Sequence, residues 1–535
     1  MSMNKKKYPV KALAAICATL ALAACAEWDD HYDATAGGSD KTLWQTMSQQ
    51  SQLSDFCEVL EHTSVFRQHR KTSVTYSQLL DGGQSFTVLA PVNGTFNKDS
   101  LLRLVATAQG DSMVERSFVL NHLSRSNVSA LADVQEMRLA NTKRIDIGGG
   151  MVGDVRIATA NIHAHNGILH VMQSRVPYNY NLYEAMTDLP QFSVIGEYLR
   201  QYEEDEFDEN NSLSSGMVDG VPVYVDSVVV ERNRLLEKIG LLNAEDSTYW
   251  MVAPTTQGWQ RAWDEAFSHF VYDETVDKRD SIQQYWTNRA LLDDAVFSMT
   301  LQDSPEDSLI SGQYDRRHPE YHVFYKPLSD GILSRADRIV HCSNGLLYQT
   351  SEWPFLPEET YFCEVKSEGE QTALVLDYNS CTYNARIYSA DSISENGYLD
   401  IVPATATANW NATFKVENTL AGSYDVCAII LPKSVYNSLS PDLRPCKFRA
   451  QINYVDEQGT SQSFNCNNTT FTSDPLRVDT VVLAKGFTLP VCNYDQVNSK
   501  ISVRLTCNIL ARETASYARE MFLDCIYLRP SSKEE

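Results

Sequence analysis

The chain has 535 residues, of which 43% are hydrophobic and 21% are charged. This balance is ordinary for folded domains and excludes a largely disordered chain, and the length suits three or four domains. The formal net charge of −24 gives a surface that repels phosphate backbones, so nucleic acid is excluded as a partner.

The first 24 residues have the pattern of a bacterial lipoprotein signal peptide. Lysines occur at positions 5, 6, 7 and 11, and an apolar run from Ala12 to Ala24 ends beside Cys25. The run is shorter than the ~20 residues that span a bilayer core, and small residues before a cysteine suit a signal peptidase. We expect residues 1–24 to be removed and lipid on Cys25 to anchor the chain. The alternative is an ordinary cleaved signal peptide with a chance cysteine.

Residues 25–39 form a predicted tether. The segment from Glu27 to Asp33 is acidic, and a Gly-Gly-Ser run follows it as a flexible linker. An acidic cluster just after the cysteine resembles the signal that sends lipoproteins of the Bacteroidota to the outer face of the outer membrane. We therefore expect an outer-membrane lipoprotein exposed on the cell surface. The alternative is an acidic tether that is merely solvated.

The next region, residues 40–177, shows helical spacing followed by strand patterns. Apolar residues recur at a helix period between Thr42 and Val65. Residues 84–91 alternate like a strand, and Asn93 is placed to cap a helix that begins near Phe96. Further on, Asn-Gly at 166–167 lies between two strand-like runs, which predicts a β-hairpin because both residues tolerate positive φ.

Two segments of this region resemble the signatures of the fasciclin-like domain. The first spans residues 86–96 and the second residues 161–171, in the order and at the spacing that suit one domain of about 130 residues. The resemblance implies a compact α+β domain concerned with adhesion or surface interactions, and it implies no chemistry. The motif residues are Phe86, Thr87, Ala90, Pro91, Asn93, Phe96, His122, Asn166, Gly167 and His170.

Between the two signatures the family often carries a Tyr-His pair that has been linked with adhesion. Here Asn121 replaces the tyrosine beside His122, which weakens a receptor-binding role for this stretch. The alternative role for His122 is that of a hydrogen-bonded histidine at the edge of the core.

A second, divergent copy is predicted in residues 178–352, because self-comparison finds both signatures again. Residues 249–259 resemble the first signature and residues 339–348 the second, but no central histidine motif is recognisable. The resemblance implies the same fold and leaves a shared ligand site in doubt. The matching motif residues are Ala253, Pro254, Asn344 and Gly345.

Residues 353–535 have short runs rich in Val, Ile, Tyr and Thr between turn residues, a pattern typical of an all-β sandwich. Scattered strands in this part resemble galactose-binding-like jelly rolls, some of which are carbohydrate-binding modules. That resemblance implies sugar stacking on exposed aromatic rings, with Trp410 as the first candidate and Tyr383 and Tyr388 behind it. The alternative is that these aromatics pack in the core.

Eight cysteines lie in the same last third of the chain. Export permits disulfides, yet several of the cysteines fall within predicted strands, where buried free thiols fit equally well. None forms a Cys-x-x-Cys pair, so structural zinc has little support.

Known catalytic motifs are absent from the sequence. The acidic block from Glu203 to Glu209 has the carboxylates to bind calcium but lacks the spacing of a ligand loop, which favours a solvated acidic loop. His163, His165 and His170 lie near the Asn-Gly turn, but a fourth metal ligand is missing. We therefore expect no metal and no cofactor.

The sequence thus predicts a multidomain chain, with two α+β fasciclin-like domains followed by an all-β, jelly-roll-like sandwich. The first functional hypothesis is a non-catalytic surface lipoprotein for adhesion or protein interaction. The alternative is a glycan-binding accessory lipoprotein of a Sus-type polysaccharide uptake system, with an outer-membrane transporter complex as partner.

Overall fold

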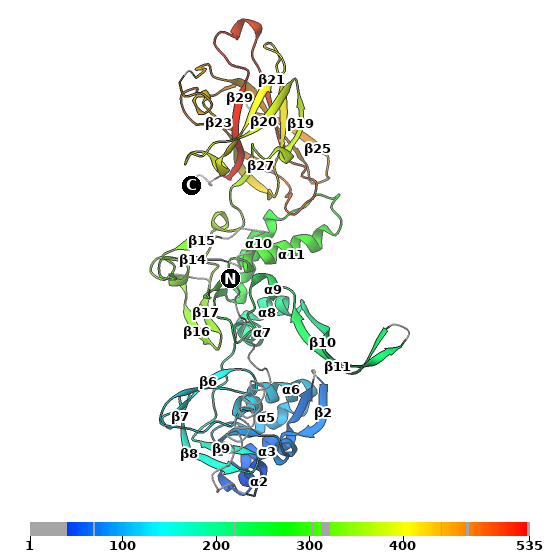
Figure 1. Cartoon of the computed structure of the whole chain (residues 1–535), viewed down its shortest axis with the longest axis vertical. Coiled ribbons are helices and arrows are strands. Elements are labelled where there is room, and N and C mark those ends of the chain that lie inside the picture. Colours follow the sequence, from blue (N-terminus) through cyan, green and yellow to red (C-terminus); the bar gives the residue numbers. More distant parts are fainter. Residues whose placement is uncertain are drawn as a thin grey trace, which may run out of the picture. The chain divides into compact units, whose positions relative to one another are not determined.

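The computed structural model describes residues 40–67, 70–218, 221–300, 304–311, 322–439, 441–466 and 470–531. The chain divides into two compact units (Figure 1), one formed by Met1–Tyr180 and Glu204–Arg232, the other by Asn181–Glu203 and Asn233–Glu535. The predicted signal peptide and tether, including Cys25, lie outside the described residues. Within the described ranges, no helix combines the length and the apolar character that crossing a bilayer requires.

The first unit is built on a sheet whose described strands number seven, in the order β4-β3-β9-β8-β7-β6-β5. Strand β3 pairs with β9 in parallel, and β8 pairs with β9 antiparallel. The β8–β9 pair confirms the predicted Asn-Gly hairpin. The strands are β3 (Phe86–Pro91), β4 (Leu123–Ser124), β5 (Gln135–Arg138), β6 (Arg144–Gly148), β7 (Met151–Val152), β8 (Val155–Ala164) and β9 (Gly167–Met172).

Short helices contribute most of the core that packs on this sheet. The predicted helix between residues 42 and 65 is two helices separated by a 3₁₀ turn. Their buried faces, which include Leu43, Phe56 and Leu60, pack against Val88 and Ala90 of β3. The elements are α2 (Leu43–Ser48), α3 (Ser54–His62), α4 (Tyr76–Asp81), α5 (Lys98–Leu104), α6 (Ala108–Val114) and the hairpin β1 (Ser64–Arg67) and β2 (Arg70–Thr75).

Two local predictions in the first part of the chain are wrong. The helix expected near Phe96 begins at Lys98, and its N-cap is Asn97, whose side chain accepts from the Ser100 N–H at 3.0 Å. The acidic block from Glu203 to Glu209 is no loop, because it belongs to β10 (Glu203–Val218), which pairs with β11 (Val221–Asn233). Glu206 forms an ion pair with Arg232 of β11 at 2.9 Å.

In the second unit, the described residues of 181–203 and 233–350 form helices and a four-stranded sheet in the order β13-β12-β17-β16. Strand β12 pairs with β17 in parallel, and β16 pairs with β17 antiparallel. The elements are α7 (Leu182–Asp188), α8 (Ser193–Arg200), α9 (Leu236–Ile239), β12 (Tyr249–Pro254), α10 (Thr256–His269), α11 (Arg279–Leu292), β13 (Val296–Ser298), β14 (Ser308–Ile310), β15 (Val323–Tyr325), β16 (Arg338–Cys342) and β17 (Gly345–Thr350).

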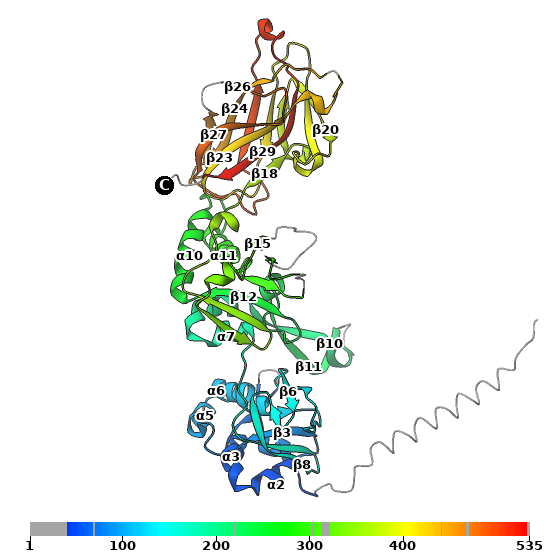
Figure 2. The ribbon, with the colours of Figure 1, turned by 90° about the vertical axis from the view of Figure 1, so that its left-hand side faces the viewer.

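Two antiparallel sheets form a β-sandwich from residue 365 onward, as predicted (Figure 2). The β29 sheet has the order β20-β21-β29-β23-β27, with β18 also on β29, and the β28 sheet has the order β19-β22-β28-β24-β25, with β26 also on β24. The strands are β18 (Val365–Glu368), β19 (Val375–Asn379), β20 (Cys381–Ile387), β21 (Gly397–Pro403), β22 (Asn411–Lys415), β23 (Gly422–Leu431), β24 (Lys447–Val455), β25 (Ser461–Asn465), β26 (Phe471–Thr472), β27 (Asp479–Leu489), β28 (Ser502–Cys507) and β29 (Met521–Pro530).

Alternation along the strands fills the interior of the sandwich. In β28, Val503 and Leu505 are buried while Arg504 between them is partly exposed, because successive side chains in a strand point to opposite faces. Phe270 and Tyr272, which follow α10, belong to the same buried cluster. The sandwich core is therefore completed by residues from the segment that precedes it in the second unit.

Candidate functional site

The fasciclin signature residue Asn166 joins three backbone segments of the first unit. Its Oδ1 accepts from the Leu43 N–H at 2.7 Å, and its Nδ2 donates to the carbonyls of Leu80 at 2.9 Å and Gly82 at 2.7 Å. Gly167 follows with φ +147°, and a Cβ there would lie 1.9 Å from the Phe86 carbonyl oxygen. Only glycine fits that approach. The Asn-Gly pair is therefore a structural clip that ties α2 and α4 to the parallel strand pair.

The same clip recurs around Asn344 in the second unit. Asn344 Oδ1 accepts from the Leu182 N–H at 2.9 Å, and Nδ2 donates to Leu242 at 2.8 Å and Ala244 at 3.1 Å. A Cβ on Gly345, where φ is +153°, would lie 1.8 Å from the carbonyl oxygen of Tyr249. Ala253 and Pro254 end β12 as Ala90 and Pro91 end β3, and all four are buried.

The two histidines of the first unit's motif are internal and neutral. His122 is fully buried, donates from Nδ1 to the Phe118 carbonyl at 2.7 Å and accepts at Nε2 from the Val176 N–H at 2.9 Å. Burial lowers the pKa of His122 to about 4. His170 is also fully buried, and its pKa is likewise lowered by burial. The interpretation of His122 as a hydrogen-bonded core histidine is confirmed.

The remaining motif residues have structural contacts too. Thr87 Oγ1 donates to the Ser126 carbonyl at 2.6 Å. Asn93 Oδ1 accepts from the Asp55 N–H at 3.0 Å, so it binds the first turn of α3 rather than the helix that follows it. Phe86 is buried, and the Phe96 ring lies 5.0 Å from that of Phe118. The signature therefore builds the domain and offers no exposed ligand group.

A metal site at the three histidines near the hairpin is not formed. His163 and His165 are exposed, whereas His170 is buried and uses both ring nitrogens. Its Nε2 donates to the Val128 carbonyl at 3.0 Å, and its Nδ1 accepts from the Asn161 N–H at 3.3 Å. No ring nitrogen of His170 remains for a metal ion.

The prediction that Trp410 is a sugar-stacking platform is wrong. Its side chain is fully buried in the sandwich core, where the indole N–H donates to the Arg519 carbonyl. A buried ring has no free face for a sugar, so the core-packing alternative holds. Tyr383 is partly buried against the same core, while Tyr388 is 38% exposed. The sequence missed Tyr378, which is 50% exposed and lies 5.0 Å from the Tyr383 ring in a T-shaped pair.

The cysteines of the last third form no disulfides within the described ranges. Seven of the eight are buried, Cys363 being the partly exposed one. Burial raises the pKa of Cys466 to about 11 and of Cys492 to about 12. These thiols are hydrophobic core residues, in agreement with the free-thiol alternative.

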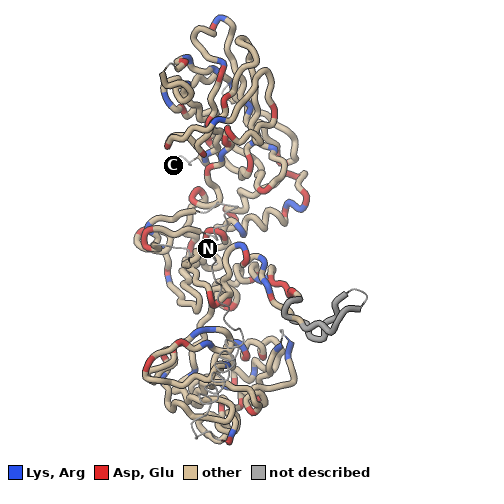
Figure 3. The backbone as a smooth tube through the Cα atoms, in the orientation of Figure 1, with Lys and Arg blue, Asp and Glu red and all other residues tan. Residues whose placement is uncertain are grey.

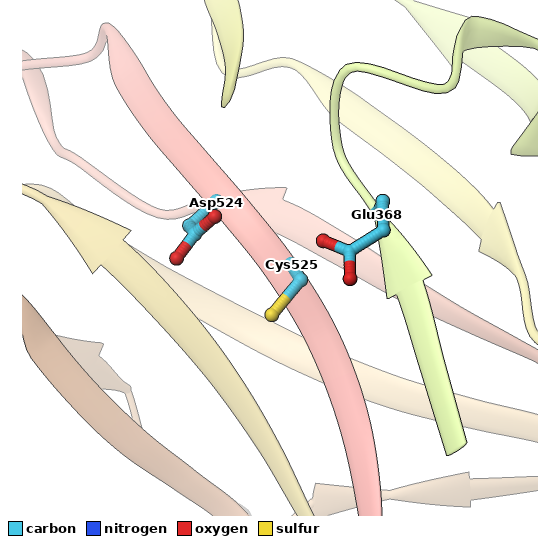
Figure 4. A group of neighbouring side chains, drawn as sticks. All are labelled: Glu368, Asp524 and Cys525. Carbon is cyan, nitrogen blue, oxygen red and sulfur yellow. The ribbon is translucent and has the colours of Figure 1, made fainter. Parts of the chain in front are cut away.

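Buried carboxylates gather on the β29 sheet, where the sequence predicted no metal. Glu368 of β18 and Asp524 and Cys525 of β29 bring their ligand atoms within 4.8 Å of one another (Figure 4). The Ser394 N–H donates to both Asp524 oxygens and its hydroxyl to Glu368 Oε1, yet Glu368 Oε2 has no hydrogen-bond partner among the described residues. Burial, with Glu368 and Glu370 nearby, raises the pKa of Asp524 to about 7.

The two carboxylates of this set suit a divalent cation, whereas the buried Cys525 thiol, whose pKa is raised by burial, is no ligand for a hard ion. Carboxylate oxygens are the ligands that Ca²⁺ and Mg²⁺ prefer, and a cation would neutralise carboxylates that burial otherwise keeps from ionising. No sequence pattern pointed to the trio, because β18 and β29 lie at opposite ends of the sandwich segment and meet only through strand pairing.

A second polar group joins the end of α11 to the β14–β15 hairpin. Asp294 Oδ1 accepts from the Ser311 hydroxyl at 2.5 Å and from His322 Nδ1 at 2.8 Å. Although burial opposes the charge, hydrogen bonds to Asp294 and to the Cys363 thiol raise the pKa of His322 to about 10. His322 is therefore charged at neutral pH, and the arrangement is an ion pair that fixes the hairpin.

The outward face of the β28 sheet is polar. Strand register aligns one row of side chains as Asn379, Asn411, Thr506 and Arg449, and the next as Asp377, Thr413, Arg504, Gln451 and Asn465. A hydrogen bond of 3.0 Å from Gln451 to Asn465 links two strands of the second row. Amides, hydroxyls and guanidinium groups cover this face, and they are groups that hydrogen-bond sugars.

Comparison with protein families identifies part of the chain. Residues 61–175 match the model described as Fasciclin domain. These residues are a fasciclin domain. The match runs from the end of α3 to beyond β9, so the buried Asn-Gly clip of Asn166 and Gly167 lies within it. A comparison with curated proteins gave no match.

The solved structures that resemble parts of the chain include a fasciclin domain pair and carbohydrate-binding modules. A FAS1 domain pair from the insect cell adhesion molecule fasciclin I has 11% identity and a TM-score of 0.20, covering 58% of this chain and 99% of that one. A family 35 carbohydrate-binding module from Clostridium thermocellum has 9% identity and a TM-score of 0.20, covering 31% and 98%.

The CBM22-1–GH10 modules of the Clostridium thermocellum xylanase Xyn10B, complexed with xylohexaose, have 8% identity and a TM-score of 0.22. That match covers 31% of this chain and 28% of the xylanase chain, so it spans less than a third of the relative. At these TM-scores the similarities carry no argument about ligand or mechanism.

Proposed function

We propose that the chain is a non-catalytic surface protein that mediates adhesion or protein interaction through two fasciclin-like domains. The observation that carries the proposal is the fasciclin match of residues 61–175. Its buried signature, with His122 and Asn166 fully engaged, supports a scaffold rather than a reaction centre. The contact surface of such a domain lies among its exposed residues and not in the signature.

Residues 178–352 are the second fasciclin-like domain in this proposal. The support is geometrical, because Asn344 repeats the three hydrogen bonds of Asn166 and Gly345 repeats the close approach of Gly167. The parallel pair β12–β17 also repeats the parallel pair β3–β9, each with an antiparallel hairpin partner.

Anchoring through Cys25 places these domains on the outer membrane, in an orientation that exposes them to the surroundings. The support is the sequence pattern of residues 1–24. The test is fractionation of cells that express the Cys25→Ser variant, which should release an intact chain from the membrane fraction. A variant that stays with the membrane contradicts the lipid anchor.

Adhesion is tested on cells that display the full chain, a chain lacking residues 40–352, or a chain lacking residues 353–535, at equal surface density. Deleting residues 40–352 should abolish adhesion to a host-cell or protein-coated surface, while deleting the sandwich should preserve it. If the chain without residues 40–352 adheres as well as the full chain, the proposal fails.

A second candidate function is glycan capture for a Sus-type uptake system with an outer-membrane transporter as partner. The observation that favours it is the polar outward face of the β28 sheet, which carries amide, hydroxyl and guanidinium groups. A glycan array probed with the full chain and with the chain lacking residues 353–535 tests it. Absence of any bound glycan, or binding that survives the deletion, counts against it.

A further inference from the structure

Two arginines on the outward face of the β28 sheet have no carboxylate partner. Arg449 of β24 is exposed and Arg504 of β28 is partly exposed, and neither guanidinium group forms a hydrogen bond or ion pair with any residue that the structure describes. The chain has 69 acidic and 45 basic residues, and the two signs are interspersed along both units (Figure 3).

Strand register brings the two arginines together. Arg504 is directly opposite Gln451, and Arg449 precedes Gln451 by two positions on the same strand. They are diagonal cross-strand neighbours on one face, with Cβ atoms about 7–8 Å apart. Two long side chains at that separation can converge on a single anion, and without an anion their like charges repel.

The groups around the arginines accept and donate hydrogen bonds. Asn411 Oδ1 is shielded from solvent and has no donor among the described residues, while Thr413 and Thr506 flank Arg504 along and across the strands. Lys415 and Lys447 border the face but are paired with Glu417 and Glu513, respectively. The carboxylate on this face is Asp377 of the edge strand β19, separated from Arg504 by β22.

The dimensions of the face suit an extended chain of sugars. Five strands from β19 to β25 lie about 4.8 Å apart, which gives a width of roughly 19 Å, about four sugar residues long. The outward positions from Asn411 to Gln451 carry amides, hydroxyls and guanidinium groups rather than apolar side chains. A peptide would leave its apolar groups unburied here, whereas the hydroxyls of a polysaccharide would find partners.

From these observations we propose that the outward face of the β28 sheet binds an anionic polysaccharide, with Arg449 and Arg504 contacting its carboxylate or sulfate groups. The inference rests on the second proposed function, glycan capture, and names its site and ligand class.

The experiment measures binding of the full chain to polygalacturonate and to dextran sulfate, each beside its uncharged counterpart, methyl-esterified polygalacturonate and dextran. The first pair tests carboxylates and the second sulfates. At least one charged polymer should bind about tenfold or more tightly than its counterpart, because the charge-assisted hydrogen bonds are lost with the charge. Its affinity should also fall as salt rises.

The variant Arg449→Gln/Arg504→Gln should weaken binding of the charged polymer by about tenfold or more. The matched control is Lys485→Gln/Arg512→Gln, which removes the same charge from exposed positions elsewhere on the sandwich and should leave binding unchanged. Equal melting temperatures for both variants and the wild-type chain show that the sandwich is intact.

The other outcomes separate the two ideas. Equal binding of charged and uncharged polymers overturns the inference but leaves glycan capture standing. If Arg449→Gln/Arg504→Gln binds the charged polymer as tightly as the wild-type chain does, the binding site is not on the outward face of the β28 sheet. Binding of poly-glutamate as tight as that of the polysaccharides overturns the ligand class in favour of an acidic protein. If no polysaccharide on a broad array binds, glycan capture and the inference both fail.

Discussion

The Asn-Gly clip of the first unit and the acidic cluster of the β29 sheet are both buried and polar, but their hydrogen bonds differ. Asn166 makes a hydrogen bond with its Oδ1 and two with its Nδ2. Glu368 leaves one oxygen without a partner in the described chain, and the pKa of Asp524 is raised to about 7. A satisfied polar group stabilises a fold, whereas two buried carboxylates that lie close together must hold a proton or bind a cation.

The largest effect is expected from Asn166→Ala, because it removes the clip. Three buried backbone groups lose their partners, which should destabilise the first unit by about 4 kcal/mol. The measurement is the urea dependence of labelling at buried Cys57, a thiol of the first unit. Asn97→Ala is the control, since it removes only an exposed helix cap of about 1 kcal/mol. If Asn166→Ala and Asn97→Ala lower the free energy of unfolding by the same amount, the Asn-Gly clip does not hold the first unit together.

Lowering the pH should change the stability of the first unit and that of the β-sandwich in opposite directions. The pKa of folded His122 is about 4, below its ordinary 6.5, so its contribution is full above pH 6.5 and is lost as the pH falls toward 4, by about 3 kcal/mol. The pKa of Asp524 is raised from 3.8 to about 7. The folded sandwich therefore binds this proton more tightly than the unfolded chain does, and its stability should rise as the pH falls from 7 toward 3.8.

Labelling of Cys57 and Cys525 with a disulfide reagent that works in acid reads the two units separately in urea at pH 7 and pH 4.5. The variant His122→Gln separates the contribution of the histidine to the pH dependence of stability from that of Glu115. The pKa of Glu115 is raised by burial, so its contribution has the opposite sign. If the first unit of His122→Gln keeps the full pH dependence, another group carries it.

Calcium should stabilise the β-sandwich, which contains the acidic cluster, and not the first unit, which contains the Asn-Gly clip. At 100 times its dissociation constant a bound cation stabilises the folded state by about 2.7 kcal/mol, and this gain should appear in the β-sandwich and not in the first unit. Asp524→Asn should abolish the gain and leave the calcium-free sandwich at least as stable as before, because it removes a buried charge. Asp442→Asn, an exposed carboxylate paired with Arg444, is the control. A calcium response that persists in Asp524→Asn excludes this site.

The smallest effect is expected from Trp410→Phe. It removes the hydrogen bond from the indole to the Arg519 carbonyl and some buried volume, which should cost about 1–2 kcal/mol. Glycan binding, where present, should not change, because the ring is buried. Weaker glycan binding with unchanged stability would restore Trp410 as a ligand residue.

Sequence patterns predicted the features that depend on neighbours in the chain. The Asn166-Gly167 hairpin and the β-sandwich followed from turn residues and strand alternation. These patterns could not predict the exposure of single side chains, because exposure depends on which strands pair. Trp410 lies in a polar stretch of sequence and is nevertheless covered by the segment around Arg519. Glu368, Asp524 and the arginine pair were missed for the same reason, since register alone brings them together.

The parallel pairing of β3 with β9 also constrains the order in which the first unit can fold. Phe86 lies opposite Gly167, so β3 can pair with β9 only after a segment almost a whole domain later in the sequence is available. Contacts of such long sequence separation slow folding. During synthesis, Val88 and Leu89 stay without their β9 neighbours until the hairpin of β8 and β9 has emerged. A chain that is interrupted before Met172 should therefore need a chaperone to avoid aggregation.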